Sequence, residues 1–562
     1  MAEDVHYEVF LKKNEKSGWA LHGACKERDE SIKVAHSLLA QHKSGSVRVS
    51  KEYFNNGERT FRSVPIFEGG AEAFGKVKDK TGDAALPCFA PDDLSKGHAR
   101  DTIRRSLTGW FERQQALPME LLHSAHLVEK LEASGTELQH AVQKVAVASA
   151  QTSDANVQTV VKQLNDLVQL SLNRIYKDAR ENRLQTYPKG KDFAQVASDI
   201  HNSDARGYAL RAAMADRLKS SRKYGDKLET LLEMADTLPV EEKAREFAHN
   251  EVDAYLTDLI GFDAGREALL GKCNDLGETV IRLTCLYDGD HGAEALGMAP
   301  RSAKRMAQKI GDGDLGECRT AIAQVLLKEL EKPKRLRPSS IREEIRLARD
   351  LAQKLVMSAD AALPADRLIK AFTARSSRLL QPEAIDELLR YARDPNEEIE
   401  FLLGLEENLV GEGNKSKLAG YVRSTLGANK TETHFVRGPG KPLEALSQLT
   451  AHQARVLRGS YPERDKNELA TALDQLGLKI LDTTNILCAV EKGPRPALDR
   501  AQALLKLAQA GALPKGECLR DAQARAMRLL KSEMGLKEAQ SPDGRPKVQQ
   551  IQQLMSQLNT AA

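Results

Sequence analysis

Aromatic residues are scarce in this 562-residue chain and amount to 5% of it. All-β folds depend on Tyr, Phe and Trp, so this scarcity argues against an all-β architecture. A surplus of charge is missing too, because 83 Lys and Arg stand against 80 Asp and Glu, a formal net charge of +3. Because positive and negative charges are nearly equal in number, the net charge gives no reason to expect a nucleic acid or an anionic membrane as partner.

Closely spaced cysteines are also missing. The seven are Cys25, Cys88, Cys273, Cys285, Cys318, Cys488 and Cys518. Without a CxxC pair, neither a zinc ribbon nor a disulfide framework is indicated. No run reaches the roughly 18 apolar residues of a membrane helix, and the acidic start Met1–Asp4 does not fit a secretory signal. We therefore expect a protein of the reducing cytoplasm.

The chain also lacks the short motifs of common active sites, namely the GxxxxGK[ST] phosphate loop, the GxSxG elbow and HExxH. The segment 311–316 has dinucleotide-fingerprint spacing, but it follows a predicted helix at 301–310 and carries two aspartates that would repel phosphates, so we expect a helix end. The segment 288–292 begins like a calcium loop but has Gly292 and Ala293 where an oxygen ligand and a glycine belong, which predicts a turn.

Isolated residues with reactive side chains do not assemble into a predicted site. His123 and His126 are three residues apart on a predicted helix, with His140 farther along. A catalytic zinc site would need at least one more placed ligand, so we expect surface or interface histidines. Cys88 has no base or family signature beside it, so we expect an inert thiol. We predict no catalytic residue, no cofactor-binding residue, no cofactor and no metal.

The densest basic run is 332–337, Lys-Pro-Lys-Arg-Leu-Arg. It could hold phosphates of a nucleic acid, but a solvated interdomain linker is the favoured interpretation. Ser340 and Glu343 follow with the spacing of a capping box, which predicts a helix start there.

Residues 5–67 differ from the rest of the chain. Apolar residues alternate at Val5, Tyr7, Val9 and Leu11, as in a half-buried strand, and a second short strand carries Trp19 and Leu21. Helical spacing follows from Ile32 to Leu39 behind the acidic Asp29-Glu30, and alternation returns from Val47 to Phe67 around a turn at 55–57. The order predicts a small ββαββ domain.

Basic and aromatic residues are interleaved within this domain. They are Arg48, Lys51, Tyr53, Arg59, Phe61 and Arg62. Such a sheet face could stack RNA bases, but the solvated face of edge strands explains it too, and we favour a protein-interaction or assembly module.

After residue 100 the apolar period becomes that of helices, so the fold is expected to be mainly α, built of helical hairpins in an irregular superhelical or bundle arrangement. The boundaries follow from Gly and Pro. We expect an α/β domain at 1–67, a Gly/Pro linker at 68–100, a helical bundle segment at 101–185, helical domains at 204–330 and 340–410, a Gly-rich linker at 411–442 and a C-terminal helical domain at 443–562.

A Leu-Pro pair recurs between helical patterns at 238–239, 363–364 and 513–514, with apolar residues at similar offsets around it. Proline fits the first helical position, so each pair predicts the link of a helical hairpin. The copies lie much farther apart than the period of about 20–50 residues of tandem repeats, which favours several larger helical blocks with one recognisable hairpin each.

Two functions remain open from the sequence. The favoured one is a cytoplasmic, non-catalytic scaffold or regulatory adaptor that binds protein partners through helical surfaces and could form a homo-oligomer. The alternative is a nucleotide-dependent regulator or an enzyme whose site combines residues distant in sequence.

Overall fold

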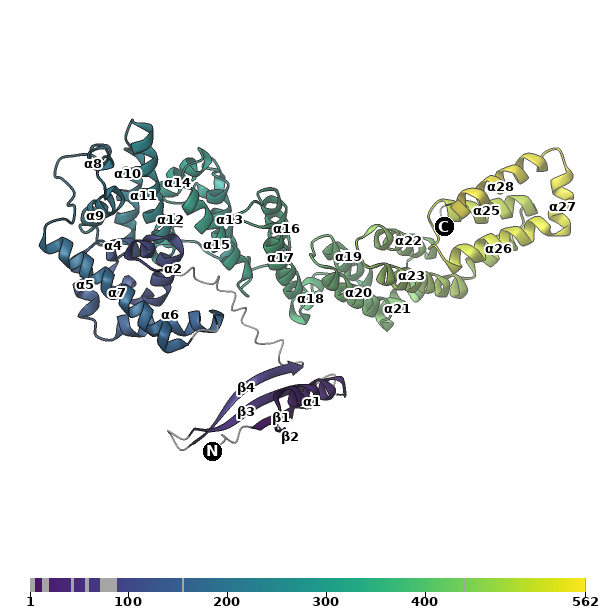
Figure 1. The fold of residues 1–562 in the computed structure, drawn as a ribbon. Helices are drawn as coiled ribbons and strands as arrows, with labels where there is room; N and C mark the ends of the chain where they lie inside the picture. Colours follow the sequence, from purple (N-terminus) through teal and green to yellow (C-terminus); the bar gives the residue numbers. More distant parts are fainter. Residues whose placement is uncertain are drawn as a thin grey trace. The chain divides into compact units, whose positions relative to one another are not determined.

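The computed structural model describes residues 6–12, 20–41, 45–55, 60–70, 88–153, 156–438 and 440–560. The chain divides into two compact units, one of residues 1–87 with 146–160 and one of residues 88–145 with 161–562. The fold is mainly α with one small sheet near the N-terminus, as predicted (Figure 1). Within the described ranges, no helix combines the length and apolar character needed to cross a bilayer.

The N-terminal domain is the predicted ββαββ unit. Its elements are β1 (His6–Lys12), β2 (Ala20–Cys25), α1 (Arg28–Gln41), β3 (Ser46–Asn55) and β4 (Thr60–Gly70). The strands pair antiparallel in the order β2-β1-β3-β4, and Val9 lies opposite Val49. Alternation places Val9, Val47 and Val49 in the core together with Ala35 and Leu38 of α1. The predicted turn begins at Asn55, and its next residues lie outside the described ranges.

The predicted linker at 68–100 is only partly described. β4 continues to Gly70, and residues 71–87 lie outside the described ranges. From residue 88 onwards the chain is not an extended tether. The short 3-10 helix η2 (Pro91–Ser95) leads into α2 (Gly97–Ser106), and Ala99 and Arg100 are buried, so packing orders this end of the predicted linker.

The other helices follow in chain order. They are α3 (Thr108–Gln114), α4 (Pro118–Leu121), α5 (Ala125–Glu132), α6 (Glu137–Ser153), α7 (Val157–Arg180), α8 (Phe193–His201), α9 (Arg206–Leu218), α10 (Tyr224–Asp236), α11 (Glu242–Ile260), α12 (Asp263–Leu270), α13 (Leu276–Tyr287), η3 (Glu294–Leu296), α14 (Arg301–Gly311), α15 (Gly316–Glu331), α16 (Ile341–Met357), α17 (Ala365–Leu379), α18 (Pro382–Leu389), α19 (Pro395–Glu406), α20 (Glu412–Leu426), α21 (Asn429–Arg437), α22 (Pro442–Arg458), α23 (Glu463–Thr484), α24 (Ile486–Glu491), α25 (Ala497–Gln509), α26 (Glu517–Lys531), α27 (Glu533–Gln540) and α28 (Gly544–Thr560).

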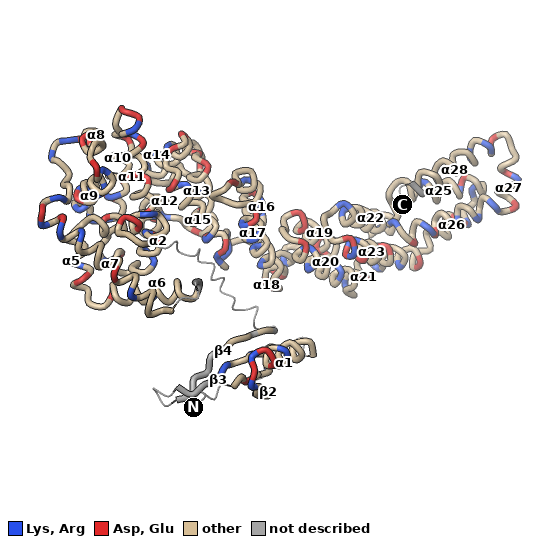
Figure 2. The backbone as a smooth tube through the Cα atoms, in the orientation of Figure 1, with Lys and Arg blue, Asp and Glu red and all other residues tan. Residues whose placement is uncertain are grey.

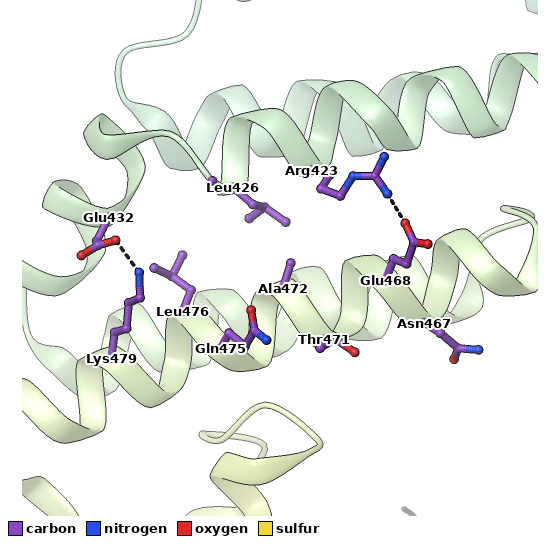
Figure 3. A pocket seen from close by; sticks show the side chains of 11 residues that line it. Arg423, Leu426, Glu432, Asn467, Glu468, Thr471, Ala472, Gln475, Leu476 and Lys479 are labelled. Carbon is purple, nitrogen blue, oxygen red and sulfur yellow. Dashed lines mark hydrogen bonds and ion pairs between the residues drawn. The ribbon is translucent and has the colours of Figure 1, made fainter.

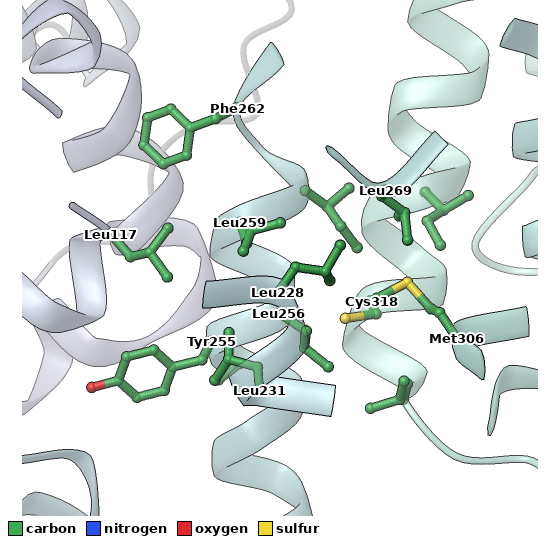
Figure 4. Close-up of a cluster of buried hydrophobic side chains, with 14 of the residues drawn as sticks. Leu117, Leu228, Leu231, Tyr255, Leu256, Leu259, Phe262, Leu269, Met306 and Cys318 are labelled. Atoms are coloured by element: carbon green, nitrogen blue, oxygen red, sulfur yellow. The ribbon is translucent and has the colours of Figure 1, made fainter. Parts of the chain in front are cut away.

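Two hydrophobic cores hold the helices of the larger unit together. The first contains buried residues from Leu107 to Phe372, and the second contains buried residues from Ile341 to Leu558. Figure 4 shows part of the first core, where leucines of α10 and α11 meet Met306 of α14 and Cys318 of α15. The cores overlap in sequence over 341–372, because α16 and α17 supply residues to both.

The Gly-rich stretch 411–442 does not form the predicted linker, since it contains α20 and α21. The prediction was wrong because it weighed helix propensity alone, and a glycine inside a helix costs only about 1 kcal/mol. In α20, burial of Leu418, Val422 and Leu426 offsets the cost of Gly413 and Gly420.

The three Leu-Pro pairs all lie in links before helices, as predicted, but none of the prolines occupies the first helical position. Pro364 is the residue before α17, whereas Pro239 and Pro514 lie three residues ahead of α11 and α26. The residues eight positions later are buried at Phe372 and Ala522 but only half-buried at Phe247.

The apolar residue five positions after each proline is buried in only two of the three copies. Ala244 and Leu519 are buried, whereas Ile369 is 54% exposed. The hairpins are therefore alike at their links and differ in how each helix packs.

Candidate functional site

The fingerprint-like segment 311–316 joins two helices, as predicted. α14 ends at Gly311, and α15 begins at Gly316. Gly313 and Leu315 have positive φ values of 89° and 58°, the left-handed conformation typical of a tight helix–helix link. The preceding element is a helix, so the strand that a dinucleotide site needs does not stand here.

The calcium-loop-like segment 288–292 is the turn that the sequence predicts. Asp288 follows the last residue of α13, and Gly289 has a φ of 69°. The nearest cation to Asp288 is Lys354 of α16, whose Nζ lies 3.4 Å from the carboxylate. Among the described residues, no group of three His, Cys, Asp or Glu is placed to hold a metal.

His123 is a correction to the sequence interpretation. It lies in the turn between α4 and α5 rather than on one helix with His126, and it is buried while His126 is exposed. Its Nδ1 donates to the Met119 carbonyl oxygen at 2.8 Å. Burial lowers the pKa of His123 to about 3, so the ring is neutral and packs as part of the core rather than acting as a surface ligand.

Cys88 has a neighbour that the sequence did not reveal. Its Sγ lies 3.7 Å from Nε2 of His98 at the start of α2. Burial and the nearby Asp93 raise the pKa of the thiol, so the nucleophilic thiolate is disfavoured. The pair does not make an activated nucleophile.

The basic run 332–337 is exposed over residues 332–334 and packed over residues 335–337. Leu336 is fully buried, Arg335 forms an ion pair with Glu387 of α18 at 2.7 Å, and Arg337 forms one with Asp275 at 2.7 Å. Through these ion pairs the two arginines connect the segment after α15 to α18 and to the start of α13. The predicted solvated linker is therefore solvated at residues 332–334, and its second half is a packed connection.

In the N-terminal domain, the side chains of Arg48 and Lys51 on β3 are half-buried. The side chains of the other four interleaved residues lie outside what the structure describes. The RNA-stacking alternative consequently stays a prediction.

A buried ion pair ties α4 to α10. Nζ of Lys227 lies 2.5 Å from Oε2 of Glu120, and the two side chains are only 4% and 3% exposed. Oε2 of Glu120 also accepts from the Leu117 backbone N–H at 2.8 Å. Burial raises the pKa of Glu120, which Lys227 opposes, so each charge depends on the other.

Two pairs of distant residues repeat one arrangement that sequence reasoning missed. Asp253 of α11 accepts backbone hydrogen bonds from Glu317 and Cys318 at 2.7 and 2.8 Å, and so caps α15. Asp474 of α23 does the same for α26. The sequence does contain a sign of this repeated arrangement, since the tripeptide Gly-Glu-Cys occurs at 316–318 and again at 516–518, outside the recurring Leu-Pro pairs.

A groove between α20, α21 and α23 is the candidate binding site, and we name it the α20–α23 groove. Its volume is about 550 Å³. It is lined by Arg423, Leu426, Gly427, Glu432, Asn467, Glu468, Thr471, Ala472, Gln475, Leu476 and Lys479 (Figure 3). Leu426, Ala472 and Leu476 form its apolar middle.

Ion pairs cross the groove on either side of that apolar middle. Arg423 of α20 pairs with Glu468 of α23, and Lys479 of α23 lies 2.5 Å from Glu432 of α21. The hydrogen bond with Lys479 lowers the pKa of Glu432, so this carboxylate stays charged at neutral pH.

Helical geometry gives the α23 wall a regular face. Asn467, Thr471, Gln475 and Lys479 are spaced by four residues, so they form one polar row along about 18 Å of helix. All four are exposed. The groove therefore offers hydrogen-bonding side chains next to a small apolar strip.

Charge is evenly mixed over the described helices. Figure 2 shows Lys and Arg interspersed with Asp and Glu along the tube, without a continuous stripe of one sign. This distribution agrees with the formal net charge of +3.

No known protein family, no curated protein and no solved structure matches this chain.

Proposed function

We propose that this chain is a non-catalytic scaffold or regulatory adaptor of the cytoplasm, and that the α20–α23 groove binds a helix of a protein partner. The observation that carries the proposal is the polar row of α23 beside the apolar strip formed by Leu426, Ala472 and Leu476. An amphipathic helix of about three turns matches the length of that row.

The charges of the groove favour a protein over a nucleotide. Arg423 and Lys479 are each paired with a carboxylate across the groove. A nucleotide phosphate would have to displace Glu468 or Glu432, whereas a protein helix can leave both pairs in place. This supports the adaptor over the nucleotide-dependent regulator.

Thr471→Arg tests the proposal. Thr471 is exposed, so the larger side chain enters the groove without disturbing the core. The matched control is Thr483→Arg, an exposed position on the same helix that lies outside the lining. Both variants should keep the helical circular-dichroism spectrum of the wild type.

Quantitative affinity purification from the native cells compares the three proteins. We expect a specific partner to bind wild type and Thr483→Arg equally and to bind Thr471→Arg at least about tenfold less, a loss of about 1.4 kcal/mol. Equal recovery of all partners with both variants would remove the groove from the proposal. Turnover of a substrate by the purified chain would promote the enzymatic alternative.

A further inference from the structure

The side of α23 that lines the α20–α23 groove is open to solvent. Glu468, Ala472, Gln475 and Lys479 follow one another at intervals of four, three and four residues, so they lie on one face of the helix (Figure 3). Gln475 and Lys479 are exposed, and Glu468 and Ala472 are half-buried. This face is therefore accessible to a helix that does not belong to the described part of the chain.

Four charged side chains mark this side of α23 in an alternating order. Arg464 and Glu468 lie near its N-terminal end, and Lys479 and Asp482 lie near its C-terminal end. The outer two are 18 residues apart, which is five helical turns, and the inner two are 11 residues apart, which is about three turns. All four therefore point to the same side, and their charges run positive, negative, positive, negative.

The middle of this face is neutral. From residue 469 to residue 478 the only charged residue is Asp474, which is buried and caps α26. The exposed side chains of this stretch are those of Thr471 and Gln475. Charge on the open side of α23 is thus confined to its two ends.

Each of the four charges can take another partner. The side chain of Arg464 is 86% exposed and pairs with Glu468 at 2.8 Å. Asp482 is exposed, and none of the ion pairs among the described residues includes it. Lys479 donates one hydrogen bond, to Glu432 at 2.5 Å, and an ammonium group has three donors. A further ion pair at either end does not require the present ones to break.

The order of these charges is complementary to itself in the antiparallel direction. If a second α23 lies antiparallel on the first about a twofold axis at residues 473–474, Arg464 faces Asp482 of the second copy. Glu468 then faces Lys479 of the second copy, and the axis repeats both contacts. Ala472 faces Gln475 of the second copy, and its small side chain lets the helices approach closely. A parallel α23 would instead place like charges opposite each other.

We propose that the helix bound in the α20–α23 groove is α23 of a second copy of this chain, in a twofold-symmetric antiparallel dimer. This inference rests on the proposed function and names the partner of the same groove. Leu426 and Leu476 border the charged face and supply apolar contact. The contact is about 27 Å long and one helix wide, smaller than a standard interface of about 800 Å² per partner, so the dimer is weak and reversible.

Sedimentation velocity of the full chain from about 1 to 200 μM tests the proposal, and we expect a reversible monomer–dimer equilibrium. Arg464→Asp and Asp482→Arg each place like charges opposite each other at both symmetric positions. Each should weaken the dimer at least about tenfold. The matched control is Glu463→Lys, since Glu463 is 81% exposed in the same turn but pairs with Lys466 on the other side of α23. It should dimerise as the wild type does.

Mixing the two charge variants tests the symmetry itself. In a mixed dimer of Arg464→Asp with Asp482→Arg, opposite charges face each other at both positions again. The mixture should therefore dimerise with nearly the affinity of the wild type, although neither variant does so alone. Recovery in the mixture also shows that both variants are folded.

Three results overturn the proposal: a wild type that stays monomeric over the whole range, charge variants that dimerise as tightly as Glu463→Lys, or a mixture without recovery. The failure of the dimer and the failure of the groove have different signatures. A monomeric wild type whose affinity purification loses a different protein on Thr471→Arg overturns the dimer and leaves the groove as a binding site. A monomeric wild type with equal recoveries overturns both.

Discussion

Asp474 and Cys518 form two hydrogen bonds that involve both backbone and side-chain atoms, although the residues are 44 positions apart in the sequence. The carboxylate of Asp474 accepts from the N–H of Cys518 at 3.0 Å, and the Cys518 thiol donates to the Asp474 carbonyl at 3.3 Å. Asp253 and Cys318 make the same two contacts in the first core. Each aspartate takes the place of a local cap at the start of the following helix, and so fixes one helix against another.

Removing the Asp474 carboxylate should therefore destabilise α26. Asp474→Ala leaves two backbone N–H groups without their acceptor, and we expect a loss of about 1–3 kcal/mol in the free energy of unfolding. Urea unfolding followed by circular dichroism measures it. Asp482→Ala, at an exposed position of the same helix, should change stability by less than about 0.5 kcal/mol. A similar effect of both substitutions would contradict the capping role.

The buried pair Lys227–Glu120 predicts a non-additive double mutant. Lys227→Met leaves the Glu120 charge buried without its cation, and we expect a loss of about 3–5 kcal/mol. Adding Glu120→Gln removes that charge and keeps an acceptor for the Leu117 N–H, so the double variant should recover more than half of the loss. Thermal unfolding of the single and double variants decides this, and additive losses would refute it.

His123 predicts a pH dependence of stability. Its pKa is about 3 in the folded chain and about 6.5 when unfolded, so the unfolded chain binds more protons between these values. Its contribution is therefore complete above about pH 6.5 and decreases as the pH falls towards 3.

The measurement compares urea midpoints of wild type and His123→Gln from pH 7.5 to 5. The wild type should lose up to about 1.4 kcal/mol more than the variant for each pH unit below about 6.5. An identical slope for both proteins would show that the ring does not titrate as proposed.

The N-terminal domain should fold without the helices. Its core consists of residues from β1, α1 and β3, all within the first 49 residues. We expect a fragment of residues 1–75 to give a mixed α/β circular-dichroism spectrum with a cooperative thermal transition. A wholly helical or a random spectrum would count against an independent domain.

Local patterns were sufficient for the type of most elements. Alternation from Val47 to Val49 predicted a buried strand face, and the helical period of the segment 101–185 predicted helices such as α7, because period two and period 3.6 place side chains on one face without help from distant residues. The Leu-Pro pairs located helix starts for a similarly local reason, since proline fits poorly inside a helix.

Propensity failed where packing outweighed it, as in the glycine-containing α20, whose buried leucines are stabilised by a core that no local window contains. The sequence alone also determined the near-neutral charge, the mainly α fold and the lack of short catalytic motifs. Only the tertiary structure decided that His123 is buried and that Asp474 caps α26. Those relationships join residues on different helices, and they depend on how helices pack, which a single-chain pattern of apolar residues leaves open.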